Sequence, residues 1–79
     1  MITIYGAPGC VYCTKCTQLA DTFELDYKYK NILEHPEEFL EQFPEIPGVP
    51  QIVWGDRKIG GYPDFAQAVN DNINDGETI

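Results

Sequence analysis

Apolar and polar positions along the chain alternate in two periods, one typical of helices and one typical of strands. Apolar side chains that recur at steps of three and four residues predict helices over residues 11–25, 35–43 and 63–72. Short runs rich in β-branched and aromatic residues predict strands over residues 2–5, 26–32, 51–54 and 58–61. The predicted order of elements is therefore β-α-β-α-β-β-α.

The apolar positions of these elements identify a candidate core. Residues 74–79, the polar tail after the last helix, are expected to be frayed. The segment 44–50 contains three prolines, so it is expected to be an irregular connection. The side chains expected on the inner faces are Cys13, Cys16, Leu19, Ala20 and Phe23 of the first helix, Tyr27, Tyr29 and Ile32 of the second strand, Phe39, Leu40 and Phe43 of the second helix, and Phe65, Ala66, Ala68 and Val69 of the last helix.

The order of elements predicts an α/β fold built on a four-stranded mixed sheet. A right-handed β-α-β crossover makes the first two strands parallel. The tight turn over residues 55–58 closes an antiparallel hairpin between the last two strands. A chain of 79 residues has one small core, so we expect a single domain over residues 1–79.

Charge and composition exclude several classes of function. The chain has 13 acidic and 5 basic residues and a net charge of −8, which repels phosphate backbones and argues against nucleic-acid binding. No stretch approaches the roughly 20 apolar residues of a membrane span, and the first residues show no secretory signal. We therefore expect a soluble monomer in the cytoplasm, with no membrane partner.

The segment GCVYCTKC, residues 9–16, carries three cysteines at even spacing. A disulfide framework is disfavoured because the count is odd and the cytoplasm is reducing. A zinc site needs about four ligands, usually in two pairs. His35 is the one candidate for a fourth ligand, and we interpret it as a surface residue at a helix start, so no metal is expected.

The remaining interpretation is a redox dithiol formed by Cys10 and Cys13. Both lie between the first strand and the first helix, where free backbone N–H groups and the helix dipole favour a thiolate. A C-x-x-C near a β-α-β pattern indicates a thioredoxin-like redox motif. Cys16 is expected to be a small apolar core residue, and the alternative is a backup thiol that pairs with Cys13.

Three motifs give nearly the whole chain a resemblance to a known family. CVYC at residues 10–13 is similar to the motif C-P-Y-C, GVP at residues 48–50 to T-V-P, and IGGYPD at residues 59–64 to G-G-x-x-D. In this order and spacing the chain resembles the dithiol glutaredoxins, which belong to the thioredoxin superfamily. The resemblance implies a thioredoxin-like fold with a four-stranded mixed sheet flanked by three helices.

The same resemblance implies the roles of the site residues. Cys10 and Cys13 are the implied catalytic pair, and a cis peptide before Pro50 would present the backbone of the preceding residue to a substrate. The implied substrate-binding and glutathione-binding residues are Tyr12, Lys15, Val49, Pro50, Gly60, Gly61, Tyr62 and Asp64.

The chain also departs from the family pattern. Val11 replaces the usual proline, and Gly48 replaces threonine. Ala7 and Pro8 stand where many members carry a lysine, which leaves Lys15 as the nearest cation along the sequence.

The resemblance implies a glutathione-dependent thiol-disulfide oxidoreductase. Such an enzyme reduces protein disulfides and glutathione mixed disulfides, uses glutathione as reductant and holds no bound cofactor. One alternative is a glutaredoxin-like electron donor that is reduced by thioredoxin reductase, with ribonucleotide reductase as an example of its acceptor. The other alternative is a module that binds an iron–sulfur cluster through Cys10 and glutathione.

Overall fold

Four strands form one mixed sheet in the spatial order β2-β1-β3-β4. The computed structural model describes residues 1–45 and 48–77, with side chains up to residue 71. The central strand β1 is parallel to β2 and antiparallel to β3, and β4 pairs with β3 as an antiparallel hairpin. The predicted pairing is confirmed. The strands are β1 (Ile2–Gly6), β2 (Tyr27–Asn31), β3 (Gln51–Trp54) and β4 (Arg57–Gly60).

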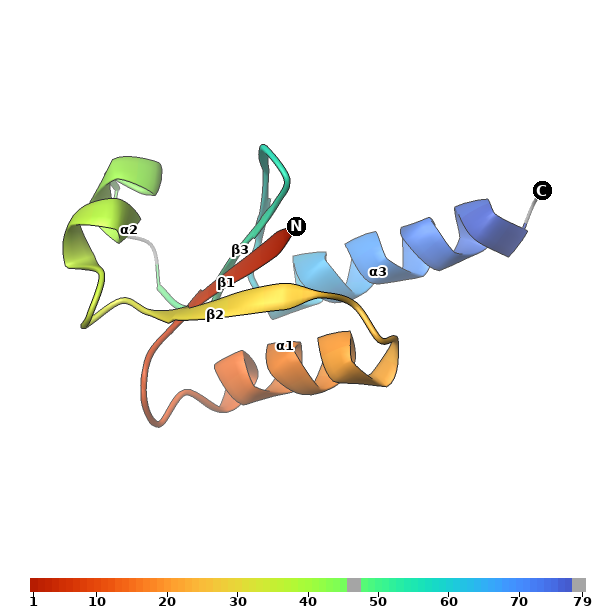
Figure 1. Cartoon of the computed structure of the whole chain (residues 1–79), viewed down its shortest axis with the longest axis horizontal. Helices are drawn as coiled ribbons and strands as arrows, with labels where there is room; N and C mark the ends of the chain where they lie inside the picture. Colours follow the sequence, from red (N-terminus) through yellow and green to blue (C-terminus); the bar gives the residue numbers. More distant parts are fainter. Residues whose placement is uncertain (46–47, 78–79) are drawn as a thin grey trace.

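Three helices flank the sheet, so the predicted thioredoxin-like order of elements is confirmed. They are α1 (Val11–Thr22), α2 (Pro36–Gln42) and α3 (Tyr62–Glu77). Figure 1 shows α2 standing apart from α1 and α3. None of the described helices is long and apolar enough to cross a membrane.

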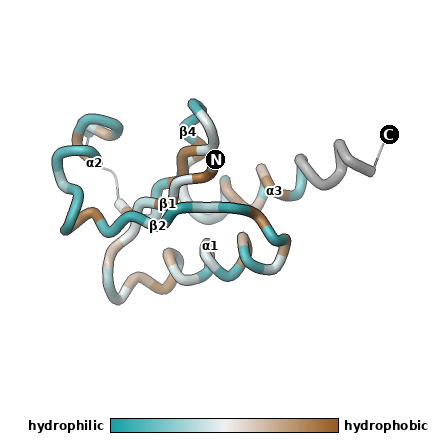
Figure 2. The backbone as a smooth tube through the Cα atoms, in the orientation of Figure 1, coloured by the Kyte–Doolittle hydropathy of each residue, from teal (hydrophilic) through white to brown (hydrophobic). Residues whose placement is uncertain are grey.

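The buried side chains form two clusters because successive residues of β1 point to opposite faces of the sheet. The larger cluster joins β1 and β3 to the inner faces of α1 and α3, and the smaller one joins β1 to α2. In Figure 2 the start of β1 is hydrophobic, whereas the edge strand β2 is largely hydrophilic. The larger cluster contains Ile2, Ile4, Cys16, Ala20, Ile52, Phe65 and Val69, and the smaller contains Tyr5, Phe39 and Phe43.

Helix α1 ends earlier than predicted. It stops at Thr22 rather than near Leu25, because Glu24 adopts a positive φ of 54° and turns the chain out of the helix. The N–H of Leu25 then donates to the carbonyl of Ala20 at 2.8 Å. Phe23 was expected to face inward, but it follows the last turn and is 45% exposed.

Two other expected core positions are wrong. Tyr29 lies on the edge strand β2, which has one neighbouring strand to cover it, and Leu40 lies on the outer side of the two-turn helix α2. Their exposed fractions are 42% and 44%. Ile32 lies beyond the end of β2 and packs instead against the cluster under α2.

Helix α3 is longer than predicted. The pattern predicts an end near residue 72 and a frayed tail from residue 74, but the helix continues to Glu77. A polar sequence does not by itself end a helix, because the helix is held by backbone groups and this segment contains no proline. Residues 78–79 of that tail, and residues 46–47 of the proline-rich connection, lie outside the described residues.

Candidate functional site

Cys10 occupies the N-cap position of α1. Its backbone is extended, with φ −89° and ψ 111°, and its sulfur accepts a hydrogen bond from the backbone N–H of Cys13 at 3.2 Å. On the other side, the Cys10 thiol donates to the carbonyl oxygen of Val49 at 3.8 Å. The half-buried Cys10 sulfur therefore lies between the Cys13 N–H of the first helical turn, which has no partner within the helix, and the backbone that precedes Pro50.

Cys13 lies one turn further into the helix and is shielded from solvent. Its side chain is 1% exposed. The pKa of the Cys13 thiol is raised to about 11, chiefly by burial and then by its hydrogen bond with Cys10. The Ala7 backbone and the Tyr29 hydroxyl lower this pKa by smaller amounts. An accessible first thiol beside a shielded second thiol is the arrangement that the C-x-x-C spacing predicts.

Cys16 belongs to the core, as predicted. Its side chain is 0% exposed and packs in the larger cluster. Burial is the main reason that the pKa of the Cys16 thiol rises to about 12, so this thiol is protonated at neutral pH. All three cysteines are free thiols in the structure.

A groove of about 380 Å³ opens beside Cys10. The peptide bond between Val49 and Pro50 in its wall is cis, which confirms what the family resemblance implies. Three further predicted residues, Tyr12, Gly61 and Tyr62, line the same groove. The groove therefore brings together residues from the start of α1, the segment before β3 and the start of α3.

Lys15 lies on the aromatic rim of this groove. Its Nζ atom is 5.0 Å from the ring centroid of Tyr12 and 5.9 Å from that of Tyr62, and the two ring centroids are 5.9 Å apart. Ammonium groups at these distances are attracted to aromatic rings. Both aromatic contacts hold the Lys15 charge close to the groove.

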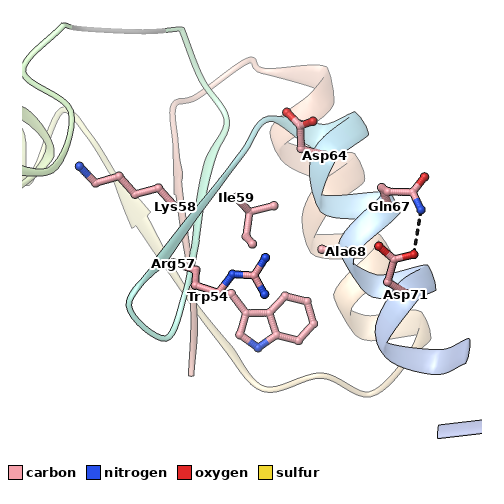
Figure 3. Close-up of a pocket in the computed structure, with 8 residues that line it drawn as sticks. All are labelled: Trp54, Arg57, Lys58, Ile59, Asp64, Gln67, Ala68 and Asp71. Atoms are coloured by element: carbon pink, nitrogen blue, oxygen red, sulfur yellow. Dashed lines mark hydrogen bonds between the residues drawn. The ribbon is translucent and has the colours of Figure 1, made fainter. Parts of the chain in front are cut away.

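Gly60 and Asp64 are placed differently from the other predicted residues. The carboxylate of Asp64, in the first turn of α3, lies directly against Gly60, where φ is 119° and a side chain at position 60 would collide with it. Asp64 lines a second cavity of about 440 Å³ between the β3–β4 hairpin and α3 (Figure 3). It is therefore next to the groove but does not line it.

Sequence reasoning missed several residues of the site. Gln51 and Pro63 line the groove. In the sequence, only their position next to predicted site residues pointed to them. Tyr29 was assigned to the core, yet its hydroxyl donates to the Ala7 carbonyl at 3.5 Å, in the loop before α1. Among the described residues, no group of three or more His, Cys, Asp or Glu side chains is arranged to hold a metal ion.

The fold and the site together define a class of protein. A thioredoxin-like sheet carries the C-x-x-C pair at the start of its first long helix, and a cis-proline turn faces the first thiol. The sequence model of the glutaredoxin family matches residues 2–59, and the chain belongs to that family, whose members are generally thiol-disulfide oxidoreductases.

Individual relatives agree with this assignment. Glutaredoxin 1 of Escherichia coli K12 is 35% identical over 80 residues, which cover 90% of this chain and 94% of the relative. Glutaredoxin 1 of Salmonella typhimurium is 32% identical over 80 residues, covering 90% and 92%. The solved structure of reduced E. coli glutaredoxin matches with a TM-score of 0.75 and 30% identity, covering 92% of this chain and 96% of the other.

Proposed function

We propose that this chain is a glutathione-dependent thiol-disulfide oxidoreductase that reduces protein disulfides and glutathione mixed disulfides. The observation that carries the proposal is the position of the Cys10 sulfur, which receives the Cys13 N–H at 3.2 Å and faces the Val49 carbonyl at the groove. We further propose that residues 1–79 act as a single domain and a monomer. Its compartment would be the reducing cytoplasm, where such dithiols are usually catalytic.

In the proposed reaction the Cys10 thiolate attacks one sulfur of a substrate disulfide. A Cys10–substrate disulfide forms, and the other substrate sulfur leaves with the electron pair as a thiolate. Cys13 then attacks the Cys10 sulfur, so that the Cys10–Cys13 disulfide forms and the second substrate thiolate is released. Two molecules of glutathione reduce this disulfide and are oxidised to one glutathione disulfide, so no bound cofactor is required.

The groove offers contacts suited to a peptide with carboxylates, such as glutathione. The backbone of Val49, which lines the groove beside Pro50, can pair with an extended substrate in the manner of an added strand. Tyr12 and Tyr62 supply flat apolar surfaces, and Lys15 supplies a positive charge at the rim. We assign Lys15 to a glutathione carboxylate.

The start of α3 completes the proposed glutathione site. Gly61 lines the groove beside the Pro50 carbonyl, and a Cβ atom added there would meet that oxygen at 3.7 Å, an ordinary contact distance. Gly60 allows the Asp64 carboxylate to approach the backbone closely. We assign Asp64 and the adjoining helix N-terminus to the γ-glutamyl end of glutathione, which carries both an amino and a carboxylate group.

Substitution of the two thiols separates the two steps. Cys10→Ser is expected to abolish all turnover, whereas Cys13→Ser should retain removal of glutathione from a glutathionylated protein and lose reduction of protein disulfides. Turnover can be followed as NADPH consumption coupled through glutathione reductase. Wild-type activity in Cys10→Ser would refute the proposal.

The glutathione site has its own test. Lys15→Met keeps the length of the side chain and removes its charge, so the KM for a glutathione mixed disulfide should rise about 2–5-fold, as expected for an exposed charge contact of roughly 0.5–1 kcal/mol. Lys28→Met, on the exposed edge strand, is the matched control. An equal change of KM in both variants would contradict the role of Lys15.

A second candidate function keeps the dithiol chemistry and changes the reductant. Ala7 and Pro8 stand where many family members have a lysine, so the groove has one cation fewer than usual for glutathione. This observation favours reduction by thioredoxin reductase, with electrons passed to an acceptor such as ribonucleotide reductase. NADPH consumption with glutathione and glutathione reductase, compared with that with thioredoxin reductase, separates the candidates.

A further inference from the structure

Gln51, the first residue of β3, is tied back to the segment that precedes the strand. Its side-chain Nε2 donates a hydrogen bond to the carbonyl oxygen of Gly48 at 2.9 Å. Gln51 is opposite Tyr5 of β1, which belongs to the smaller cluster, so its side chain lies on the sheet face that carries α2. The hydrogen bond closes a ring that contains the two residues between its ends, Val49 and Pro50.

These four residues all line the groove beside Cys10, but they are not held equally. Pro50 is buried, and Val49 packs against the smaller cluster while its carbonyl oxygen accepts from the Cys10 thiol at 3.8 Å. Gly48, in contrast, is exposed, and a Cβ atom added there would meet nothing within 4 Å. Packing therefore does not hold this end of the segment, and the Gln51 amide holds its carbonyl instead.

The peptide group that Gln51 holds is the one that carries the Val49 N–H. The Gly48 carbonyl and the Val49 N–H belong to one planar group, so the direction of the carbonyl fixes the direction of the N–H. Position 48 has glycine in place of the threonine of the family pattern, and glycine leaves the backbone freer than any residue with a side chain. One hydrogen bond favours a single orientation of such a group by a factor of about 2–13.

We propose that Gln51 is a positioning residue for peptide substrates: its amide fixes the plane of the Gly48–Val49 peptide and so orients the Val49 N–H for pairing with the substrate backbone. This inference rests on the proposed function of Cys10 and the groove. In the reaction itself the Cys10 thiolate attacks the glutathione sulfur of a mixed disulfide, a bond forms between these two sulfurs, and the other thiol leaves with the electron pair as a thiolate. Gln51 takes no part in that transfer.

Two chromogenic mixed disulfides test the inference. One joins glutathione to nitrothiobenzoate and the other joins mercaptoethanol to nitrothiobenzoate, so both release the same coloured thiolate when Cys10 attacks, and only the first carries a peptide backbone. Gln51→Met roughly keeps the length of the side chain and removes the amide. With the glutathione compound, the concentration that gives the half-maximal rate should rise about 2–13-fold, as expected for one hydrogen bond. The limiting rate, and the rate with the mercaptoethanol compound, should change much less.

Two further variants separate positioning from other causes. Gln67→Met is the matched control, because Gln67 also donates through Nε2 at 2.9 Å, but to Asp71 on α3. Gly48→Ala, added to Gln51→Met, restricts the backbone at an open position and should lower the half-maximal concentration again by about 2–5-fold. Alanine cannot replace a direct contact between the Gln51 amide and glutathione, so this recovery is specific to positioning.

Each outcome decides between the claims. A higher half-maximal concentration with the glutathione compound alone, absent in Gln67→Met and partly reversed by Gly48→Ala, supports the inference. An equal slowing with both compounds, an unchanged Gln51→Met, or a loss that Gly48→Ala does not reverse overturns it and leaves the proposed function standing. Release of the coloured thiolate by Cys10→Ser at the wild-type rate overturns the proposed function, and the inference with it.

Discussion

Replacement of Gly6 with alanine is expected to push the Tyr29 ring away from β1 and from the loop before α1. An added Cβ atom would collide with the hydroxyl oxygen of Tyr29 and lie 2.8 and 2.9 Å from two of its ring carbons. Carbon atoms in contact prefer a separation of about 3.5–4.0 Å. The ring therefore has to move by several tenths of an ångström or more, and its hydroxyl loses the Ala7 carbonyl.

The change in unfolding free energy caused by Gly6→Ala is the sum of two opposing effects. Overpacking of this kind costs about 1–3 kcal/mol. Alanine in place of glycine gains about 0.4–1 kcal/mol because it restricts the unfolded chain. Tyr29 is 42% exposed and can swing toward solvent, so the net loss of unfolding free energy should lie near the lower end, at about 1 kcal/mol. For a domain of this size, that loss lowers Tm by about 4–8 °C.

Urea unfolding under reducing conditions measures the unfolding free energy of the wild type and the variant. Gly48→Ala is the matched control, because a Cβ atom there meets nothing within 4 Å, so its stability should be unchanged or slightly raised. In a Tyr29→Ala background, Gly6→Ala should no longer destabilise the protein. An equal loss of unfolding free energy from Gly6→Ala in that background would refute the reasoning.

Three further predictions concern the core thiols and one surface ion pair. Cys16→Ala should lower the unfolding free energy by about 1 kcal/mol through a small cavity and leave dithiol turnover unchanged, and a loss of turnover would show that this thiol reacts. The pKa values of Cys13 and Cys16 rise on folding from 9.0 to about 11 and about 12. The unfolding free energy of the reduced protein should therefore fall as the pH rises above about 9, and it should fall less in Cys16→Ala. Hydrogen bonds from Lys30 and Tyr5 lower the pKa of Glu38 below its ordinary value of 4.5. The stability that the ionised Glu38 carboxylate provides should therefore be lost on acidification below that value, and Glu38→Gln should flatten this part of an acid-unfolding curve.

The elements of the fold were predictable because their signals are local. Apolar spacing in α1 and α3 and β-branched runs in β1 and β3 reflect which face each element buries, and those faces form the larger cluster. The end of α1 was not predictable in the same way. It depends on a positive φ at Glu24, a residue that carries none of the usual signals of glycine or asparagine.

The dithiol and the cis-proline turn were also predictable, because a short motif marks each of them. The contact of the Tyr29 hydroxyl with the Ala7 carbonyl was not, since it requires the register that places Tyr29 opposite Ile4 and its ring over Gly6. Strand register joins residues far apart in the sequence, and a local pattern reports only that Tyr29 alternates with lysines. Asp64 matched its motif, but its carboxylate lies against Gly60, and the residue lines the neighbouring cavity rather than the groove.

The central claim, that glutathione supplies the electrons for the Cys10–Cys13 dithiol, is tested most directly by a comparison of reductants. NADPH consumption is measured with a small mixed disulfide in two reactions, one with glutathione and glutathione reductase and the other with thioredoxin reductase. The account predicts turnover with glutathione that is lost in Cys10→Ser and little turnover with thioredoxin reductase. Turnover with thioredoxin reductase alone would contradict the glutathione site at Lys15 and Asp64, while leaving the fold and the dithiol chemistry in place.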